Sequence, residues 1–203
     1  MIGSRTASTS APLRALERAL FALAVVLLGW YVVEQLSTSY YQAMSNRELE
    51  AIRIPVTAAP VPRSRVRLTR GSLVGRVDVP RVGVSSVIRE GDDTGTLRHS
   101  VGHIPETALP GDPGNAGLAG HRDTFFRRLK DVRTGDRIVV TTADSVLHYV
   151  IRATRIVGPD DVSVLNPTQS PTLTLVTCYP FNYIGAAPKR FIVQAEMAPD
   201  RRQ

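Results

Sequence analysis

The chain has 203 residues, of which 43% are hydrophobic and 21% are charged. This length and composition exclude a wholly disordered chain and suit one globular domain with additional segments. The only cysteine, Cys178, has no partner for an internal disulfide, and no cysteine cluster exists to bind zinc. The net charge is +7, but the basic residues are scattered, without interleaved aromatic residues or a DNA-reading motif, so we expect no nucleic-acid partner.

The amino-terminal region has the pattern of a membrane anchor. Residues 1–18 contain three arginines, and residues 19–33 follow without a single charge. We predict a transmembrane anchor over residues 19–36, with residues 1–18 in the cytoplasm because positive charge accumulates on that side. A cleaved signal peptide is the competing interpretation, but no small-x-small cleavage site follows directly.

A stalk and linker of residues 37–72 is expected next, because prolines and arginines dominate residues 51–70. The folded domain is predicted over residues 73–203, since short β-prone runs separated by glycine and proline begin at Leu73. A short helix is predicted over residues 94–98 and a second helical segment over residues 124–132. The predicted strands cover residues 73–79, 82–88, 116–119, 137–141, 146–155, 172–178 and 190–193. Many short strands with such turns indicate an all-β fold, a closed or nearly closed barrel.

The two last predicted strands bring a thiol and a guanidinium together. Pro180 ends the first strand near Cys178, and the second strand begins at Arg190. Successive strands are usually antiparallel neighbours, so these two residues should share one rim of the sheet. A thiolate is a nucleophile that positive neighbours favour, and arginine can stabilise an oxyanion. The alternative is that Cys178 is a small buried hydrophobe and Arg190 a solvated strand end.

Four histidines could serve as the partner of Cys178. His121 is best placed, because it follows the short apolar run that ends at Gly120 and so lies where a strand leaves the sheet. His103, in a predicted loop, is the second candidate. His148 lies within an alternating strand and is expected to be structural, and His99 is expected at a helix end or on the surface.

Several sequence stretches resemble one enzyme family. The run TLVTC, which ends at Cys178, matches the TLxTC signature of the sortases, and His121 upstream with Arg190 downstream completes their His, Cys, Arg order. The resemblance extends over about residues 73–196. The strings PGNAGLAGHRDTFFRRL and TLVTCYPFNYIGAAPKRFIV are most similar to sortases of class D.

This resemblance implies an eight-stranded sortase β-barrel with short helices, preceded here by a single transmembrane helix. It also implies a membrane-anchored cysteine transpeptidase with an extracytoplasmic catalytic domain. Its expected partners are secreted proteins with a carboxy-terminal LPxTG-like signal and an amine, such as a peptidoglycan precursor. By the same analogy Cys178 is the nucleophile and His121 is the general acid and base. Arg190 would stabilise the oxyanion or position the peptide.

The resemblance also bears on subtype and cofactors. Residues 51–72 lack the aspartate-proline-aromatic lid of pilin-polymerising sortases and the tail is polar, which favours wall anchoring. We expect neither cofactor nor metal, because Glu106, Asp112, Asp160 and Asp161 lack the spacing of a calcium loop. By analogy the segment 157–171 forms the wall that recognises the sorting signal. A thiol hydrolase without transfer and a non-catalytic barrel remain the alternatives.

Overall fold

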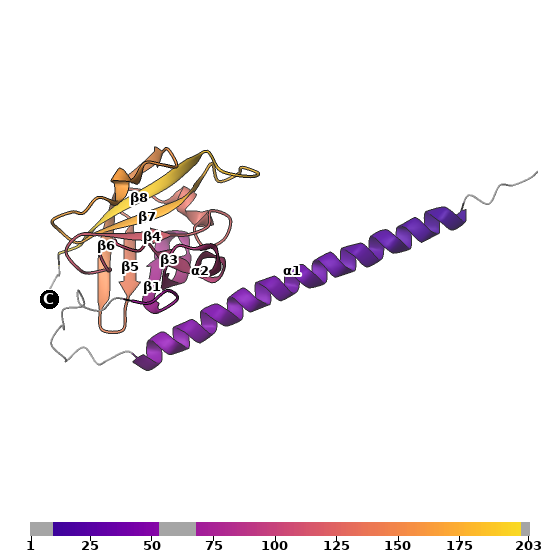
Figure 1. Cartoon of the computed structure of the whole chain (residues 1–203), viewed down its shortest axis with the longest axis horizontal. Helices are drawn as coiled ribbons and strands as arrows, with labels where there is room; N and C mark the ends of the chain where they lie inside the picture. The colour runs from indigo at the N-terminus through magenta and orange to yellow at the C-terminus, as the bar shows by residue number, and fades with distance from the viewer. Residues whose placement is uncertain (1–9, 53–67, 200–203) are drawn as a thin grey trace, which may run out of the picture. The chain divides into compact units, whose positions relative to one another are not determined.

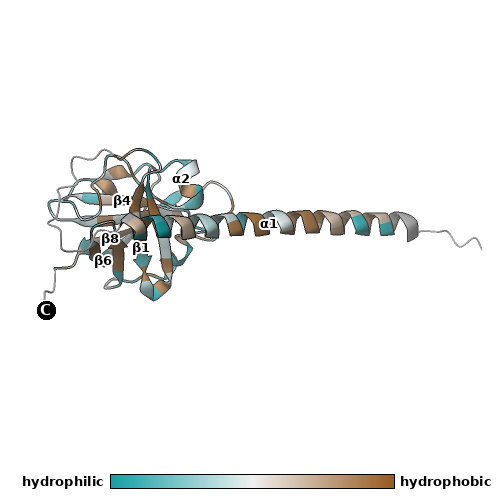
Figure 2. Cartoon of the chain, turned by 90° about the horizontal axis from the view of Figure 1, so that it is seen from below, coloured by the Kyte–Doolittle hydropathy of each residue, from teal (hydrophilic) through white to brown (hydrophobic). Residues whose placement is uncertain are grey.

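The computed structural model describes residues 10–52 and 68–199, and the chain forms two compact units, residues 1–41 and 42–203. Helix α1 (Ser10–Ile52) contains the uncharged stretch predicted to enter a membrane. All side chains of residues 19–33 are exposed, and Figure 2 shows that hydrophobic residues predominate along the middle of α1. A helix that is apolar on every side and not buried in protein suits a bilayer. By length and composition, α1 is the one helix in the described ranges that could cross a membrane.

The rest of the described chain is a closed β-barrel (Figure 1). The order around the barrel is β1-β2-β3-β4-β7-β8-β6-β5, and the prediction of a closed eight-stranded barrel with short helices is therefore confirmed. The strands are β1 (Leu73–Val79), β2 (Val84–Glu90), β3 (Val101–His103), β4 (Asn115–Ala119), β5 (Arg137–Thr141), β6 (Val146–Val157), β7 (Thr172–Tyr179) and β8 (Lys189–Met197). Four short helices join them: η2 (Pro80–Val82), α2 (Thr94–His99), η3 (Arg127–Asp131) and η4 (Val162–Leu165).

Most predicted elements lie within one or two residues of the observed ones, but β8 runs four residues beyond its predicted end at Val193, and three further differences concern β3, β2 and η3. Strand β3 was not predicted, because three residues are too few to show an alternating pattern. Strand β2 begins two residues later than predicted, because Pro80 starts the 3-10 turn η2 and Gly83 caps it with a positive φ of 66°. The helical segment predicted over residues 124–132 is the 3-10 helix η3 over Arg127–Asp131.

Alternate side chains of the strands fill the barrel interior. In β7, for example, Leu173 and Leu175 are fully buried in a core that also includes Leu118 of β4 and Val193 of β8. The residues between them point to the outer face of the sheet, because strand side chains alternate. This alternation decides which polar side chains meet at the sheet surface.

The last turns of α1 belong to the same unit as the barrel. Gln42 accepts a hydrogen bond from the backbone N–H of Val87 at 3.0 Å, and Ser45 and Glu48 both accept from the Nη2 of Arg89, at 2.8 and 2.9 Å. Leu49 is buried. Part of the predicted stalk, residues 42–52, is thus helical and packed, while residues 53–67 of the predicted linker lie outside the described residues.

A partly exposed ion pair joins η2 to the start of β5. Arg81 Nη2 donates to Asp136 Oδ2 at 2.7 Å, and the backbone N–H of Arg133 donates to the same oxygen at 2.7 Å. The hydrogen bond from Arg81 lowers the pKa of Asp136 below its usual value, and the bond from Arg133 acts in the same direction. A carboxyl with a depressed folded-state pKa stabilises the fold above its unfolded pKa and loses that contribution as the pH falls through the folded one.

We therefore expect the substitution Asp136→Asn to lower the melting temperature of the full chain at pH 7 by roughly 4 °C. The difference between the two proteins should shrink below about pH 4, where protonation removes the charge from the wild-type carboxyl as well. Thermal unfolding in an uncharged detergent at pH 7 and pH 3 measures both quantities. A deficit of equal size at both pH values would contradict the assignment to the carboxylate charge.

Candidate active site

Cys178 lies at the end of β7, one residue before the strand finishes at Tyr179. The thiol is free and the residue is half-buried. The strand was predicted to stop at Cys178 and in fact runs one residue further, to the Tyr179-Pro180 bond. The expected place of the thiol at a strand end is confirmed.

His121 leaves β4 at the same edge of the barrel. Strands β4 and β7 are parallel, with Ala119 opposite Val176. The backbone N–H of Gly120 donates to the carbonyl of Val176 at 3.1 Å, and the hydroxyl of Thr177 donates to the carbonyl of Gly120 at 2.7 Å. His121 lies two residues after Ala119, and Cys178 lies two residues after Val176. The backbone therefore brings these two residues to the same level on adjacent chain segments.

Arg190 lies on the other side of Cys178. Strands β7 and β8 are antiparallel, and Cys178 pairs directly with Arg190 across the ladder. The Nη1 of Arg190 donates to the carbonyls of Ala187 and Lys189, at 3.3 and 3.1 Å. These bonds hold the guanidinium at the point where the loop enters β8, on the rim that the sequence predicted for it.

All three side chains belong to the outer face of the barrel. The inward-facing residues of the same three segments are packed into the barrel, and they include Leu118, Thr177 and Phe191. Because side chains alternate along a strand, and directly paired residues point to the same face, Cys178 and Arg190 share the outer face. His121 continues the outward series of β4, two residues after Ala119. The backbone therefore brings a cysteine, a histidine and an arginine to one edge of the barrel, on three adjacent chain segments.

The other histidines are used differently. His103 was expected in a loop, but it is the last residue of β3 and is 2% exposed. Its Nδ1 lies 2.7 Å from Glu90 Oε2 and its Nε2 lies 2.9 Å from the carbonyl oxygen of Ala108, so both ring nitrogens are engaged. His148 lies exposed on β6, and His99 ends α2 as expected. Neither His103 nor His148 is at the edge that carries Cys178.

A loop and a short helix cover part of the outer face beside Cys178. Asn115 Nδ2 donates to the carbonyl of Val164 at 3.0 Å, and Asn115 Oδ1 accepts from the hydroxyl of Thr174 at 2.8 Å. These bonds hold η4 over β4 and β7. A Cβ placed on Gly117 would approach side chains of Leu165, Ile104 and Thr107 to within 3.0–3.2 Å, so the cover is closely packed there. Beyond Gly117, half-buried Ala119 and Val176 lead from the cover to the thiol.

Arg122, the residue after His121, has a role that no local pattern in the sequence indicates. Its guanidinium donates to three carbonyls of the loop between β7 and β8, those of Pro180, Tyr183 and Gly185, at 3.2, 2.6 and 3.1 Å. It also lies 5.9 Å from the ring centroid of Tyr183. Arg122 thus ties the segment that carries His121 to the segment that follows Cys178. The sequence shows that an arginine follows His121, but the carbonyls that this arginine binds lie about sixty positions further along the chain.

The loop carboxylates show no metal-binding arrangement. Glu106, Asp160 and Asp161 are exposed and Asp112 is half-buried, and Asp161 caps η4 by accepting from the backbone N–H of Ser163 at 3.1 Å. Over residues 10–52 and 68–199, no group of three or more histidine, cysteine, aspartate or glutamate residues is placed to hold a metal ion.

The fold and this edge of the barrel match known proteins. A family model described as "Sortase domain" matches residues 77–198. Sortase D of Bacillus subtilis (strain 168) is 37% identical over 124 residues, which are 61% of this chain and 63% of that protein. Sortase SrtE1 of Streptomyces coelicolor is 30% identical over 201 residues, which are 90% of this chain and 56% of that protein. The chain therefore spans less than two thirds of the length of these two curated relatives.

A solved structure agrees with these sequence matches. The Clostridium perfringens Sortase D5 transpeptidase has a TM-score of 0.67 and 27% identity, over 79% of this chain and 99% of that one. The family model covers more than half of the chain, from β1 to just past the end of β8. The chain therefore belongs to the sortases, a family of cysteine transpeptidases.

Proposed function

We propose that this chain is a membrane-anchored transpeptidase that cleaves an LPxTG-like signal of secreted proteins and transfers the acyl group to an amine of the cell wall. The observation that carries the proposal is the common outer face of Cys178, His121 and Arg190, which come from adjacent segments of the barrel. A cysteine nucleophile, a proton-transfer group and a fixed cation are the parts that acyl transfer needs.

In the first half of the proposed reaction, the Cys178 thiolate attacks the carbonyl carbon of the scissile peptide bond. The carbonyl oxygen becomes an oxyanion, which the guanidinium of Arg190 stabilises. When the intermediate collapses, the C–N bond breaks and His121 gives a proton to the leaving amine. The product is a thioester between Cys178 and the acyl part of the substrate.

In the second half, an amine attacks the thioester carbonyl and His121 takes its proton. The C–S bond then breaks, the thiolate of Cys178 is restored, and a new amide is released. Water can replace the amine, and the products are then a carboxylic acid and the free enzyme. Transfer and hydrolysis therefore share every residue and differ only in the acceptor.

The proposed location rests on α1 and its flanking charge. Residues 19–36 would span the bilayer, residues 1–18 would be cytoplasmic, and the barrel would be outside the cell. A substrate held in the same membrane by its own hydrophobic segment would then meet the enzyme at a raised effective concentration. The η4 helix and the rest of residues 157–171 would form the wall against which the signal peptide lies.

The test uses the full chain in an uncharged detergent, a panel of LPxTG-like peptides, and an amine acceptor. Mass spectrometry of both peptide and protein should detect a thioester adduct on Cys178 that converts to an amide-linked product. Hydrolysed peptide alone, with every acceptor tried, would favour the thiol hydrolase. No adduct with any peptide would count against both activities.

Arg190 gives a more specific expectation. The substitution Arg190→Ala should lower kcat/KM for peptide cleavage by roughly 10²-fold or more, because a fixed donor to the oxyanion is lost. Arg190→Lys should recover only part of the rate, since a lysine has a different reach and lacks the planar fork. Cleavage kinetics of both variants provide the measurement. Recovery of the full rate in Arg190→Lys would show that only the charge matters.

The loop bonds of Arg122 predict a smaller effect. Arg122→Ala should lower kcat/KM by roughly tenfold, the equivalent of one to two net hydrogen bonds of about 1 kcal/mol each. Amide hydrogen exchange over residues 181–188 should become faster, while the melting temperature changes little. Arg137→Ala, which removes an exposed arginine from β5, is the matched control. Unchanged exchange in the loop would contradict the proposed clamp.

A further inference from the structure

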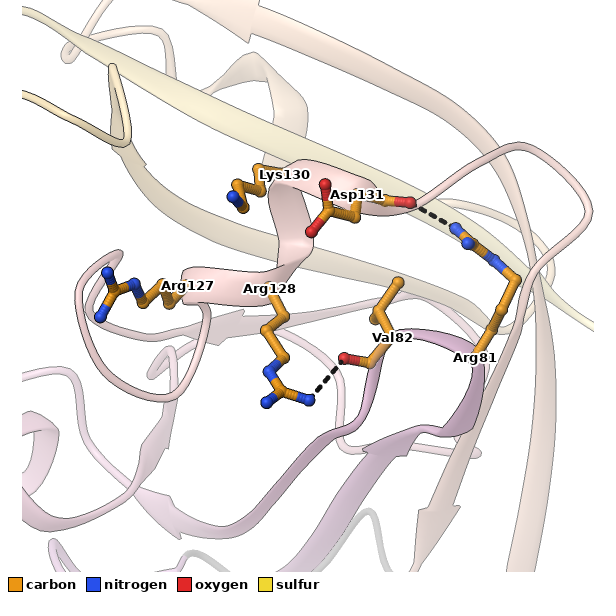
Figure 3. Close-up of a pocket in the computed structure, with 6 residues that line it drawn as sticks. All are labelled: Arg81, Val82, Arg127, Arg128, Lys130 and Asp131. Atoms are coloured by element: carbon orange, nitrogen blue, oxygen red, sulfur yellow. Dashed lines mark hydrogen bonds between the residues drawn. The ribbon is translucent and has the colours of Figure 1, made fainter.

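A cationic cavity lies between the short helices η2 and η3. Its volume is about 520 Å³, within the range of about 300–1,000 Å³ that ligand sites occupy. Figure 3 shows the residues that line it, which are Arg81, Val82, Arg127, Arg128, Lys130 and Asp131. None of the three proposed catalytic residues is among them. The cavity therefore requires an explanation separate from acyl transfer.

Two of its cations are held in place by the protein itself. Arg81 donates to the carboxylate of Asp136 at 2.7 Å and also to the backbone carbonyl of Asp131. Arg128 Nη1 lies 3.5 Å from the carbonyl oxygen of Val82, and a Cβ on Gly83 would lie 2.7 Å from that Nη1. The absence of a side chain at Gly83 thus gives the guanidinium of Arg128 its room. Cations positioned before a ligand arrives lose less entropy when they bind it.

The other two cations, which are exposed like the first two, have no ion-pair partner among the described residues. Arg127 and Lys130 project from η3, and no carboxylate within the described ranges forms an ion pair with either of them. Asp136 neutralises Arg81, and the carboxylate of Asp131 also faces the cavity. The four cations carry four positive charges and the two carboxylates carry two negative charges, so the net charge around the cavity is +2. This excess matches a group with one or two negative charges.

We propose that this cavity binds a phosphate ester. Guanidinium groups donate several N–H groups in a planar fork to phosphate oxygens, and a lysine adds a compact point charge. Three such side chains on η3, together with Arg81 of η2, line a cavity that is open to solvent. The phosphate can belong to the headgroup of an anionic phospholipid or to a soluble phosphate ester, because both present the same oxygens. The proposal does not depend on the proposed transpeptidation.

The lysine content of the chain allows a direct test. The chain has two lysines, Lys130 in the cavity and Lys189 at the start of β8, and both are exposed. Acetylation by a neutral amine-reactive reagent can therefore be followed at both sites by mass spectrometry, with Lys189 as the internal reference. The full chain is placed in phosphatidylcholine nanodiscs. One arm adds glycerol 3-phosphate, and the other replaces part of the lipid with phosphatidylglycerol.

We expect Lys130 to be acetylated more slowly in at least one arm, while Lys189 keeps its rate. Glycerol 3-phosphate at about ten times its Kd should slow Lys130 by roughly tenfold by mass action. The effect should decrease as the salt concentration rises. Protection in the first arm indicates a soluble phosphate ester as ligand, and protection confined to the second indicates a lipid headgroup.

Two double variants provide the control. Arg127→Gln with Arg128→Gln should abolish the protection of Lys130, whereas Arg137→Gln with Arg155→Gln removes as many exposed cations elsewhere and should preserve it. The melting temperatures of both variants should stay close to that of the wild type, which shows that they fold. No protection of Lys130 in either arm would overturn the proposal. So would protection that survives the loss of Arg127 and Arg128, or that Lys189 shares.

Discussion

Replacing Cys178 by alanine is expected to abolish acyl transfer and thioester formation. The proposed reaction begins with the attack of the Cys178 thiolate, and no second cysteine exists in the chain to replace it. The loss should therefore reach the background of the assay. Intact-protein mass spectrometry after incubation with an LPxTG-like peptide should show the adduct mass in the wild type and no adduct in Cys178→Ala.

The same substitution should leave the barrel intact. Cys178 is half-buried on the outer face and is not part of the inward-facing core, so loss of its sulfur creates no sealed cavity. The melting temperature of Cys178→Ala should lie close to that of the wild type. A folded Cys178→Ala protein that still forms the amide product would refute the thioester mechanism.

Replacing His121 by alanine is expected to lower turnover by roughly 10²- to 10⁴-fold, the usual contribution of a positioned proton-transfer group. The leaving amine would have to depart without a proton, and the incoming amine would attack without a base. Single-turnover measurements should show that formation of the thioester and its aminolysis both slow. A variant that slows only one of these steps would restrict His121 to that step.

The other histidines supply the controls for His121. His148→Ala should retain the wild-type rate, because this residue is exposed on β6 and away from the edge that carries Cys178. His103→Gln should lower the melting temperature, because it disturbs a buried ring bonded to Glu90 and Ala108, but the folded fraction should retain its chemistry. Near wild-type turnover in His121→Ala, together with an inactive but folded His103→Gln, would transfer the role to His103.

Local patterns in the sequence predicted most strands and the proximity of Cys178 to Arg190. Residues 138–141 are all β-branched and turn residues flank the run, and the structure has the predicted strand over Arg137–Thr141. The pairing of Cys178 with Arg190 followed from two successive strands, for which antiparallel contact is the common arrangement. Strand β3 has no such pattern, because its three residues form a strand only through ladders with β2 and β4.

The sequence by itself determined the class of fold, the apolar helix near the amino terminus, and the identity of the three residues proposed for catalysis. Only the tertiary structure decided that His121 lies beside Cys178, because parallel pairing of β4 with β7 joins residues that are far apart in the chain. It also decided that His103 is buried and bonded, and that Arg122 reaches three carbonyls of the β7–β8 loop. The cationic cavity depends in the same way on the meeting of η2 and η3. Contacts of this kind depend on strand order and closure of the barrel, which local residue patterns do not encode.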